Sequence, residues 1–242
     1  IYTLPKSQSY GYGTVKIQTG AALNVCDCSE NESGLITTCR GSYAIENSGT
    51  LNLYSGCVER SSDDSEAAVK VNTGAVFNMY GGKIGGNAKA ILSNGTVNVF
   101  GGTVRAKRGA VQVEAGSEVT VSDNAALSVT GTGYSTIAIY GGAVNIRGGT
   151  VTNDSSAAVY VPSGESTLNI SGGEISTAPS AKTDTIRLNS DSVEVTVTGG
   201  SITNGYASAA TSESSIYGWA IGVYNVKSLT ISGAPEINRI YL

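Results

Sequence analysis

The sequence predicts an all-β protein that folds as a single-stranded, right-handed parallel β-helix of about nine coils. One phrase of alternating apolar and polar residues recurs along the whole chain, a second phrase precedes each copy, and glycines separate the two. The repeat spans roughly 20 to 34 residues, which is too short for one unit to bury its own apolar row. Successive units must therefore stack, with equivalent strands about 4.8 Å apart. Right-handedness follows from strand twist and crossover preference.

In each coil, a short apolar–polar–apolar segment comes first. Its side chains alternate with a period of two, which is typical of a strand with one buried face, and they lack the spacing of a helix. Copies occupy residues 15–17, 45–47, 69–71, 91–93, 111–113, 137–139, 159–161, 186–188 and 221–223.

The recurrent phrase follows, and its clearest copy reads TVNVFGGTV at residues 96–104. The glycines mark corners at which the backbone needs a positive φ. After them comes a third apolar position, seen for example at Ile84 and Val104, so each coil contains two or three short strands. We expect the first apolar residues of the phrase to form one inward column: Leu51, Phe77, Val97, Val119, Val144, Leu168 and Val195.

We divide the chain into an N-terminal cap segment, residues 1–14, and a parallel β-helix domain, residues 15–242. The longest insertion, 203–218, is either a functional loop or a segment that Trp219 packs onto the rod. Because the last residues are apolar and uncapped, we expect a monomer that forms part of a larger multidomain chain.

Composition argues against several function classes. The net charge is −4 and the basic residues are scattered singly, so we expect no nucleic-acid partner. No apolar run is long enough for a membrane span, so we expect no membrane insertion.

The chain contains no histidine, the commonest general base and metal ligand. Two columns of outward residues, one beginning at Glu46 and one at Lys83, place no two carboxylates on neighbouring coils. Paired acid–base hydrolysis and calcium binding both need such pairs. We therefore expect no catalytic residue, metal site or cofactor. The acidic cluster of Glu59, Asp63, Asp64 and Glu66 fits a solvated loop better than a calcium site.

All four cysteines, Cys26, Cys28, Cys39 and Cys57, lie in the first two coils. Cys28 and Cys57 fall at nearly equivalent places in neighbouring coils. We expect at least one disulfide among the four, with zinc binding and free buried thiols as alternatives.

Two further columns, one of asparagines and one of aromatic residues, form one face of the predicted rod. Stacked amides and aromatic rings can be structural, or they can form a platform on which a glycan packs. If a glycan binds, the net charge favours a neutral or weakly basic one, of host or plant origin. The candidate glycan-binding residues are Asn52, Tyr54, Asn78, Tyr80, Asn98 and Phe100, with Tyr217 and Trp219 as a second location.

The phrases at residues 51–54, 77–84 and 168–175 resemble the β-helical repeats of large secreted or cell-wall-anchored surface proteins of Gram-positive gut bacteria, including adhesins. More distantly, the architecture is similar to that of pectate lyases. The first resemblance implies a non-catalytic extracellular module, an adhesin or spacer with weak glycan binding. The alternative is a polysaccharide-active enzyme, pectate-lyase-like or a glycoside hydrolase, or its accessory domain.

Overall fold

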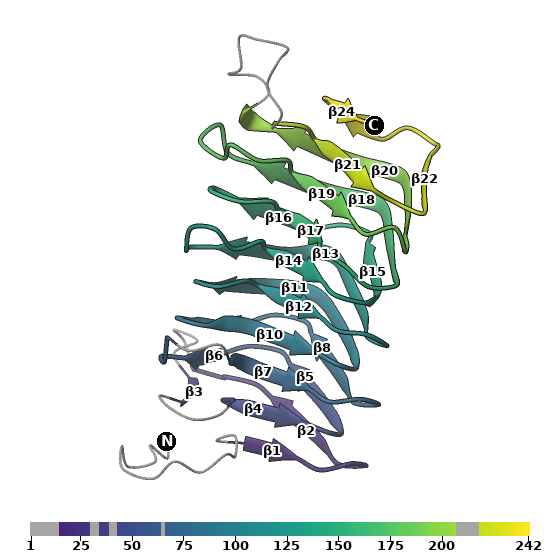
Figure 1. Cartoon of the computed structure of the whole chain (residues 1–242). Helices are drawn as coiled ribbons and strands as arrows, with labels where there is room; N and C mark the ends of the chain where they lie inside the picture. Colours follow the sequence, from purple (N-terminus) through teal and green to yellow (C-terminus); the bar gives the residue numbers. More distant parts are fainter. Residues whose placement is uncertain (1–14, 30–33, 39–42, 64–65, 207–217) are drawn as a thin grey trace.

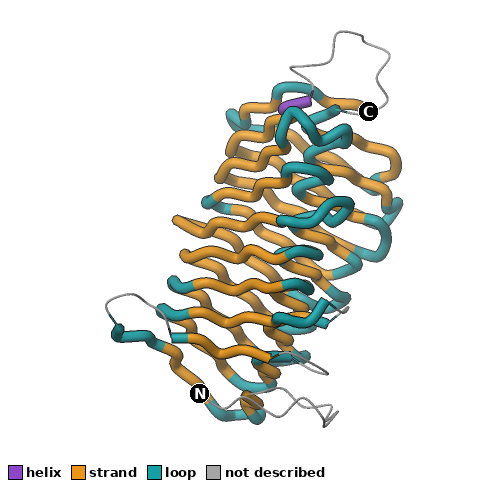
Figure 2. The backbone as a smooth tube through the Cα atoms, turned by 90° about the vertical axis from the view of Figure 1, so that its left-hand side faces the viewer, coloured by secondary structure: helices purple, strands orange, loops and turns teal. Residues whose placement is uncertain are grey.

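The computed structural model describes residues 15–29, 34–38, 43–63, 66–206 and 218–242. In this part of the chain, short parallel strands stack into an elongated β-solenoid with essentially no helix (Figures 1 and 2). The predicted fold class is confirmed, whereas the handedness stays a prediction. The proposed cap segment, residues 1–14, lies outside the described residues.

The first predicted segment of each coil forms a ten-stranded parallel sheet, here called the first sheet. Its register pairs each copy with the equivalent residues of the next coil, for example Val69 with Ile91 and Ile91 with Val111. Its strands, in spatial order, are β1 (Val15–Ile17), β4 (Ile45–Asn47), β7 (Ala67–Val71), β10 (Lys89–Ser93), β12 (Val111–Val113), β14 (Ile137–Ile139), β17 (Val159–Val161), β19 (Ile186–Asn189), β21 (Ile221–Asn225) and β24 (Ile240–Tyr241).

The recurrent phrase and the third apolar position form a fourteen-stranded parallel sheet, here called the second sheet. In four coils, the two segments merge into one long strand that bends at the corner between them. The main path is β2 (Ala22–Val25), β5 (Thr50–Leu53), β8 (Val76–Met79), β11 (Thr96–Ala106), β13 (Glu118–Val129), β15 (Gly142–Ile146), β18 (Ser166–Thr177), β20 (Val193–Asn204) and β22 (Ser228–Ile231). Beside it lie β3 (Leu35–Thr38), β6 (Cys57–Arg60), β9 (Lys83–Gly86), β16 (Thr150–Asn153) and β23 (Glu236–Ile237).

The core is a set of apolar columns that run along the rod. The predicted inward column from Leu51 to Val195 is confirmed, since each member pairs in register with the next and is at most 1% exposed. Ile84 and Val104 form part of a second buried column, at the predicted third position. Removal of these side chains from water supplies the main favourable free energy of folding.

The corners of the second sheet require positive φ. Gly102 has a φ of 85°, and a Cβ atom there would lie 2.6 Å from the carbonyl oxygen of Gly82 in the preceding coil. The corner in β13 has no glycine. Between the pairs Val99–Val121 and Gly101–Asn124, β13 has one more residue than β11, and Asp123 adopts a φ of 50°. Aspartate is among the few non-glycine residues that tolerate this region.

Candidate functional site

The predicted asparagine column is a hydrogen-bonded ladder along the second sheet. The side-chain amide of Asn52 donates to Asn24, that of Asn78 to Asn52, and that of Asn98 to Asn78, over 2.8–2.9 Å. Thr120 interrupts the ladder, which resumes with Asn169 donating to Asn145 over 3.0 Å. These amides bond to one another along the axis, which stabilises the stacking of coils.

The predicted aromatic column is also present. The rings of Tyr54 and Tyr80 stack with centroids 5.0 Å apart, and those of Tyr80 and Phe100 stack at 5.2 Å. The ring planes are close to parallel, so Tyr80 has a neighbouring ring against each face. A sugar packs on the face of an aromatic ring, and in this column the faces are largely covered by other rings. The structure brings these residues together as predicted, and glycan binding by them stays a prediction.

The acidic cluster lies partly outside the described residues, because Asp64 does. The Asp63 carboxylate forms ion pairs with Lys107 Nζ at 2.8 Å and with Arg108 Nε at 3.1 Å. These two cations hold the pKa of the Asp63 carboxyl group below its usual range. Within the described residues, no group of three or more Cys, Asp and Glu side chains is arranged to hold a metal ion.

The cysteines differ from the prediction. Cys26, Cys28 and Cys57 are free thiols, and Cys39 lies outside the described residues. The Sγ atoms of Cys26 and Cys28 are 3.7 Å apart, well beyond the bond length of about 2.05 Å in a disulfide. The predicted equivalence of Cys28 and Cys57 is wrong: Cys57 pairs with Leu35 of β3, whereas Cys28 lies beyond the end of β2 at Val25 and outside the strands.

Of the second glycan-binding location, Tyr217 lies outside the described residues. The ring of Trp219 lies 5.3 Å from that of Tyr241, and the guanidinium group of Arg239 lies 3.9 Å from its centroid. Trp219 therefore packs onto the last coil.

A buried aspartate, Asp184, anchors the chain at Trp219. The Asp184 carboxylate accepts hydrogen bonds from the Tyr224 hydroxyl at 2.8 Å and from the Trp219 backbone N–H at 3.1 Å. Burial raises the pKa of Asp184, and these hydrogen bonds oppose that shift. Gly222 leaves the necessary space, since a Cβ atom there would lie 2.5 Å from the carboxylate.

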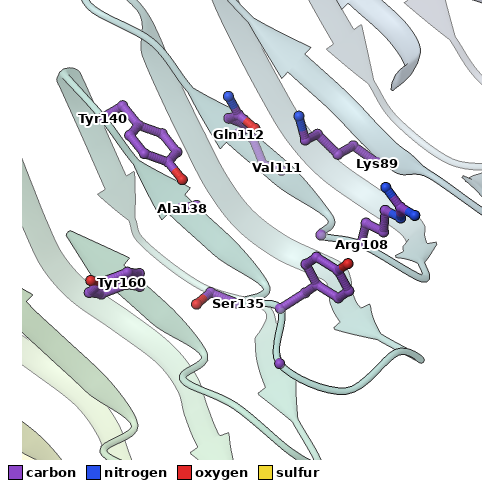
Figure 3. A pocket seen from close by; sticks show the side chains of 11 residues that line it. Lys89, Arg108, Val111, Gln112, Ser135, Ala138, Tyr140 and Tyr160 are labelled. Atoms are coloured by element: carbon purple, nitrogen blue, oxygen red, sulfur yellow. The ribbon is translucent and has the colours of Figure 1, made fainter. Parts of the chain in front are cut away.

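A concavity lies on the outward face of the first sheet, and we call it the tyrosine pocket (Figure 3). Its volume of about 370 Å³ is within the range of small-molecule sites. It is lined by Lys89, Arg108, Gly109, Val111, Gln112, Gly133, Tyr134, Ser135, Ala138, Tyr140 and Tyr160.

The pocket forms because a small residue separates two larger ones in an outward column. The column on β12, β14 and β17 consists of Gln112, Ala138 and Tyr160 in register. Because the Ala138 side chain is the shortest, the outward surface is depressed between Gln112 and Tyr160. Tyr134, in the connection before β14, and Tyr140, directly after β14, stand at its two ends. Both rings are exposed, at 39% and 44%.

Two cations complete the lining. The Arg108 guanidinium lies 5.9 Å from the centroid of the Tyr134 ring. It also forms an ion pair with Asp63, which is not part of the pocket lining. Lys89 is half-buried, and this burial lowers its pKa, whereas Glu66 and Glu114 oppose the shift. The side-chain amide of Gln112 donates a hydrogen bond to Glu114, which fixes its orientation.

Sequence reasoning missed this pocket, although the signal was present. The outward column containing Gln112, Ala138 and Tyr160 can be read from the repeat, and its small central residue predicts a depression. The other wall residues, Arg108, Tyr134 and Tyr140, lie in corner connections of varying length. Their approach to that depression follows only from the three-dimensional path of the connections.

The fold and these sites define a parallel β-helical module with structural ladders on one sheet and a ligand-sized pocket on the other. The chain matches no protein-family model, no curated protein and no solved structure. In the described part of the chain, no helix has the length and hydropathy of a membrane span.

Proposed function

We propose that this chain is a non-catalytic β-helix module of an extracellular surface protein, an adhesin or spacer, and that it binds carbohydrate in the tyrosine pocket. The observation that carries the proposal is the combination of exposed tyrosine rings with hydrogen-bonding groups around one depression. Rings supply apolar faces for sugar C–H groups, and the hydroxyls of Tyr140 and Ser135 and the amide of Gln112 suit sugar hydroxyls.

The tyrosine pocket supports this role better than the aromatic column does. Tyr160 pairs with Ala138 on one side and with Arg187 on the other, so one face of its ring lies toward the depression at Ala138. The Arg187 guanidinium, 5.9 Å from the ring centroid, lies toward the opposite side. In the aromatic column, by contrast, Tyr80 is sandwiched between two rings.

The spacer part of the proposal rests on the regular stacking. Parallel register runs from β2 to β22 along the second sheet, and the amide and aromatic ladders tie neighbouring coils together. Such a rod holds a ligand site at a fixed distance from whatever adjoins it. The extracellular setting is supported by the resemblance of the repeat phrases to surface proteins.

Binding to arrayed neutral and acidic oligosaccharides tests the proposal. A single module should bind near the millimolar range, so the protein should be displayed in many copies on beads to raise the avidity. We expect binding that is lost in Tyr140→Ala and kept in Tyr80→Ala, a matched control because Tyr80 is similarly exposed. The bound oligosaccharides should be recovered uncleaved.

Two results would contradict this assignment. Loss of binding in Tyr80→Ala together with retained binding in Tyr140→Ala would place the site on the aromatic column. Release of unsaturated or reducing sugar ends that disappears in an acidic-residue variant would favour the enzyme alternative.

A further inference from the structure

The tyrosine pocket has two chemically distinct ends. Figure 3 shows Lys89 and Arg108 at one end and Tyr140 and Tyr160 at the other, with Ala138 and Ser135 between them. These residues come from the coils that contain strands β10, β12, β14 and β17. Strands β10 and β17 are three strand spacings, or about 14 Å, apart. A short oligosaccharide can therefore contact both ends at once.

The two charged residues that line the pocket are positive, whereas the net charge of the chain is negative. The lining contains two cations, Lys89 and Arg108, and none of its residues is a carboxylate. The carboxylates that balance these cations, on Asp63, Glu66 and Glu114, are not part of the lining. A ligand in the pocket meets these two cations directly, whereas the distant charges that contribute to the total of −4 are screened beyond about 8 Å at physiological salt.

The cations are also held in position. Arg108 is fixed by the Tyr134 ring on one side and by the bond of its Nε–H to Asp63. A guanidinium has five N–H donors in a planar fork, which matches the oxygens of a carboxylate or sulfate group. Lys89 is half-buried and thus partly desolvated, so an added anion gains more from it than from a fully hydrated lysine.

We propose that the sugar bound in the tyrosine pocket is acidic, with its carboxylate or sulfate group at Lys89 and Arg108 and its ring against Tyr140 or Tyr160. This inference rests on the proposed carbohydrate-binding function and specifies its ligand class. It replaces the expectation of a neutral or weakly basic glycan, which treated the net charge as if it were evenly spread.

Calorimetric titration with three probes tests the inference: neutral galactotetraose, unsulfated chondroitin tetrasaccharide, which carries carboxylates, and a carrageenan tetrasaccharide, which carries sulfates. We expect at least one acidic probe to bind about tenfold more tightly than the neutral one. Lys89→Gln and Arg108→Gln should each weaken acidic binding about tenfold and change neutral binding less than twofold. The tighter of the two acidic probes identifies the anionic group.

The matched control is Lys83→Gln, which makes the same charge change at an exposed lysine on β9 of the second sheet and should leave acidic binding unchanged. Lys89→Gln retains the Arg108–Asp63 ion pair, so it reports on the pocket even if Arg108→Gln disturbs the corner. Equal affinity for neutral and acidic probes, lost in Tyr140→Ala, would overturn the acidic preference and leave carbohydrate binding standing. An equal effect of Lys83→Gln would also overturn it, as non-specific attraction. Absence of binding by all three probes would overturn both proposals.

Discussion

At the scale of single residues, exposure and availability differ in this protein. Tyr80 and Tyr140 are similarly exposed, at 47% and 44%, yet Tyr80 has a ring against each face and Tyr140 borders a pocket. The same distinction applies to Asn78, whose amide donates to Asn52 and accepts from Asn98. A ligand is therefore expected where polar and aromatic groups are not already paired within their own column.

Asp184 gives a pH-dependent prediction at this scale. Its pKa is raised in the folded state, so the folded protein binds the proton more tightly and stability falls as pH rises from the unfolded value of about 3.8 through the folded pKa. The hydroxyl of Tyr224 stabilises the charged form. In Tyr224→Phe, the folded pKa should rise further, and at pH 7 the variant should be less stable by about 1.5–3 kcal/mol.

Urea unfolding of the wild type and Tyr224→Phe between pH 3 and pH 8 measures this. The difference in unfolding free energy should be small at the acidic end, where the carboxyl group is protonated, and should grow as pH rises. A difference that stays constant with pH would show that the hydroxyl does not stabilise the carboxylate.

The cysteines give a second prediction. Burial and the neighbouring Glu59 raise the pKa of the Cys57 thiol to about 11, whereas Cys26 is an exposed thiol. Since the thiolate is the reactive form, Cys57 should be alkylated at pH 8 at least about tenfold more slowly than Cys26. Mass spectrometry of iodoacetamide-treated protein, without reductant, resolves the two sites; equal rates would contradict the difference in burial between the two thiols.

At the scale of elements, the corner glycines determine how closely coils can stack. Gly102 and Gly116 both have positive φ, 85° and 79°, but a Cβ atom at Gly116 would meet nothing within 4 Å. At Gly102 it would clash with the Gly82 backbone and with Met79. Gly116→Ala should therefore cost about 1 kcal/mol from backbone strain alone, and Gly102→Ala about 1–3 kcal/mol more.

Thermal and chemical unfolding of the two alanine variants separates these contributions. Gly116→Ala is the control for conformational strain, so the difference between the two variants reports the crowding between successive coils. Equal destabilisation would mean that the coils relax apart at the corner without cost.

At the scale of the whole molecule, the repeat in the sequence was enough to predict the solenoid, the inward column from Leu51 and the Asn and Tyr columns. These features depend on periodicity, and each coil imposes its register on the next. The position of Cys28 and the walls of the tyrosine pocket could not be predicted in the same way. Cys28, Arg108 and Tyr134 lie in connections, where length varies from coil to coil and no repeat fixes the position of a side chain.

The proposed function likewise depends on where ligand contacts occur on the rod. The second sheet carries the ladders that hold coils together, and the first sheet carries the depression at Ala138. This separation lets the pocket vary without weakening the stack, because its walls come mostly from outward positions and corners.

The most direct test locates the carbohydrate. Titration of ¹⁵N-labelled protein with galactotetraose and, separately, with chondroitin tetrasaccharide should shift the backbone amide signals of Ser135, Ala138 and Tyr140 and leave those of Asn52, Asn78 and Tyr80 unchanged. Shifts confined to the second group would place the site on the ladders of the second sheet and contradict the account.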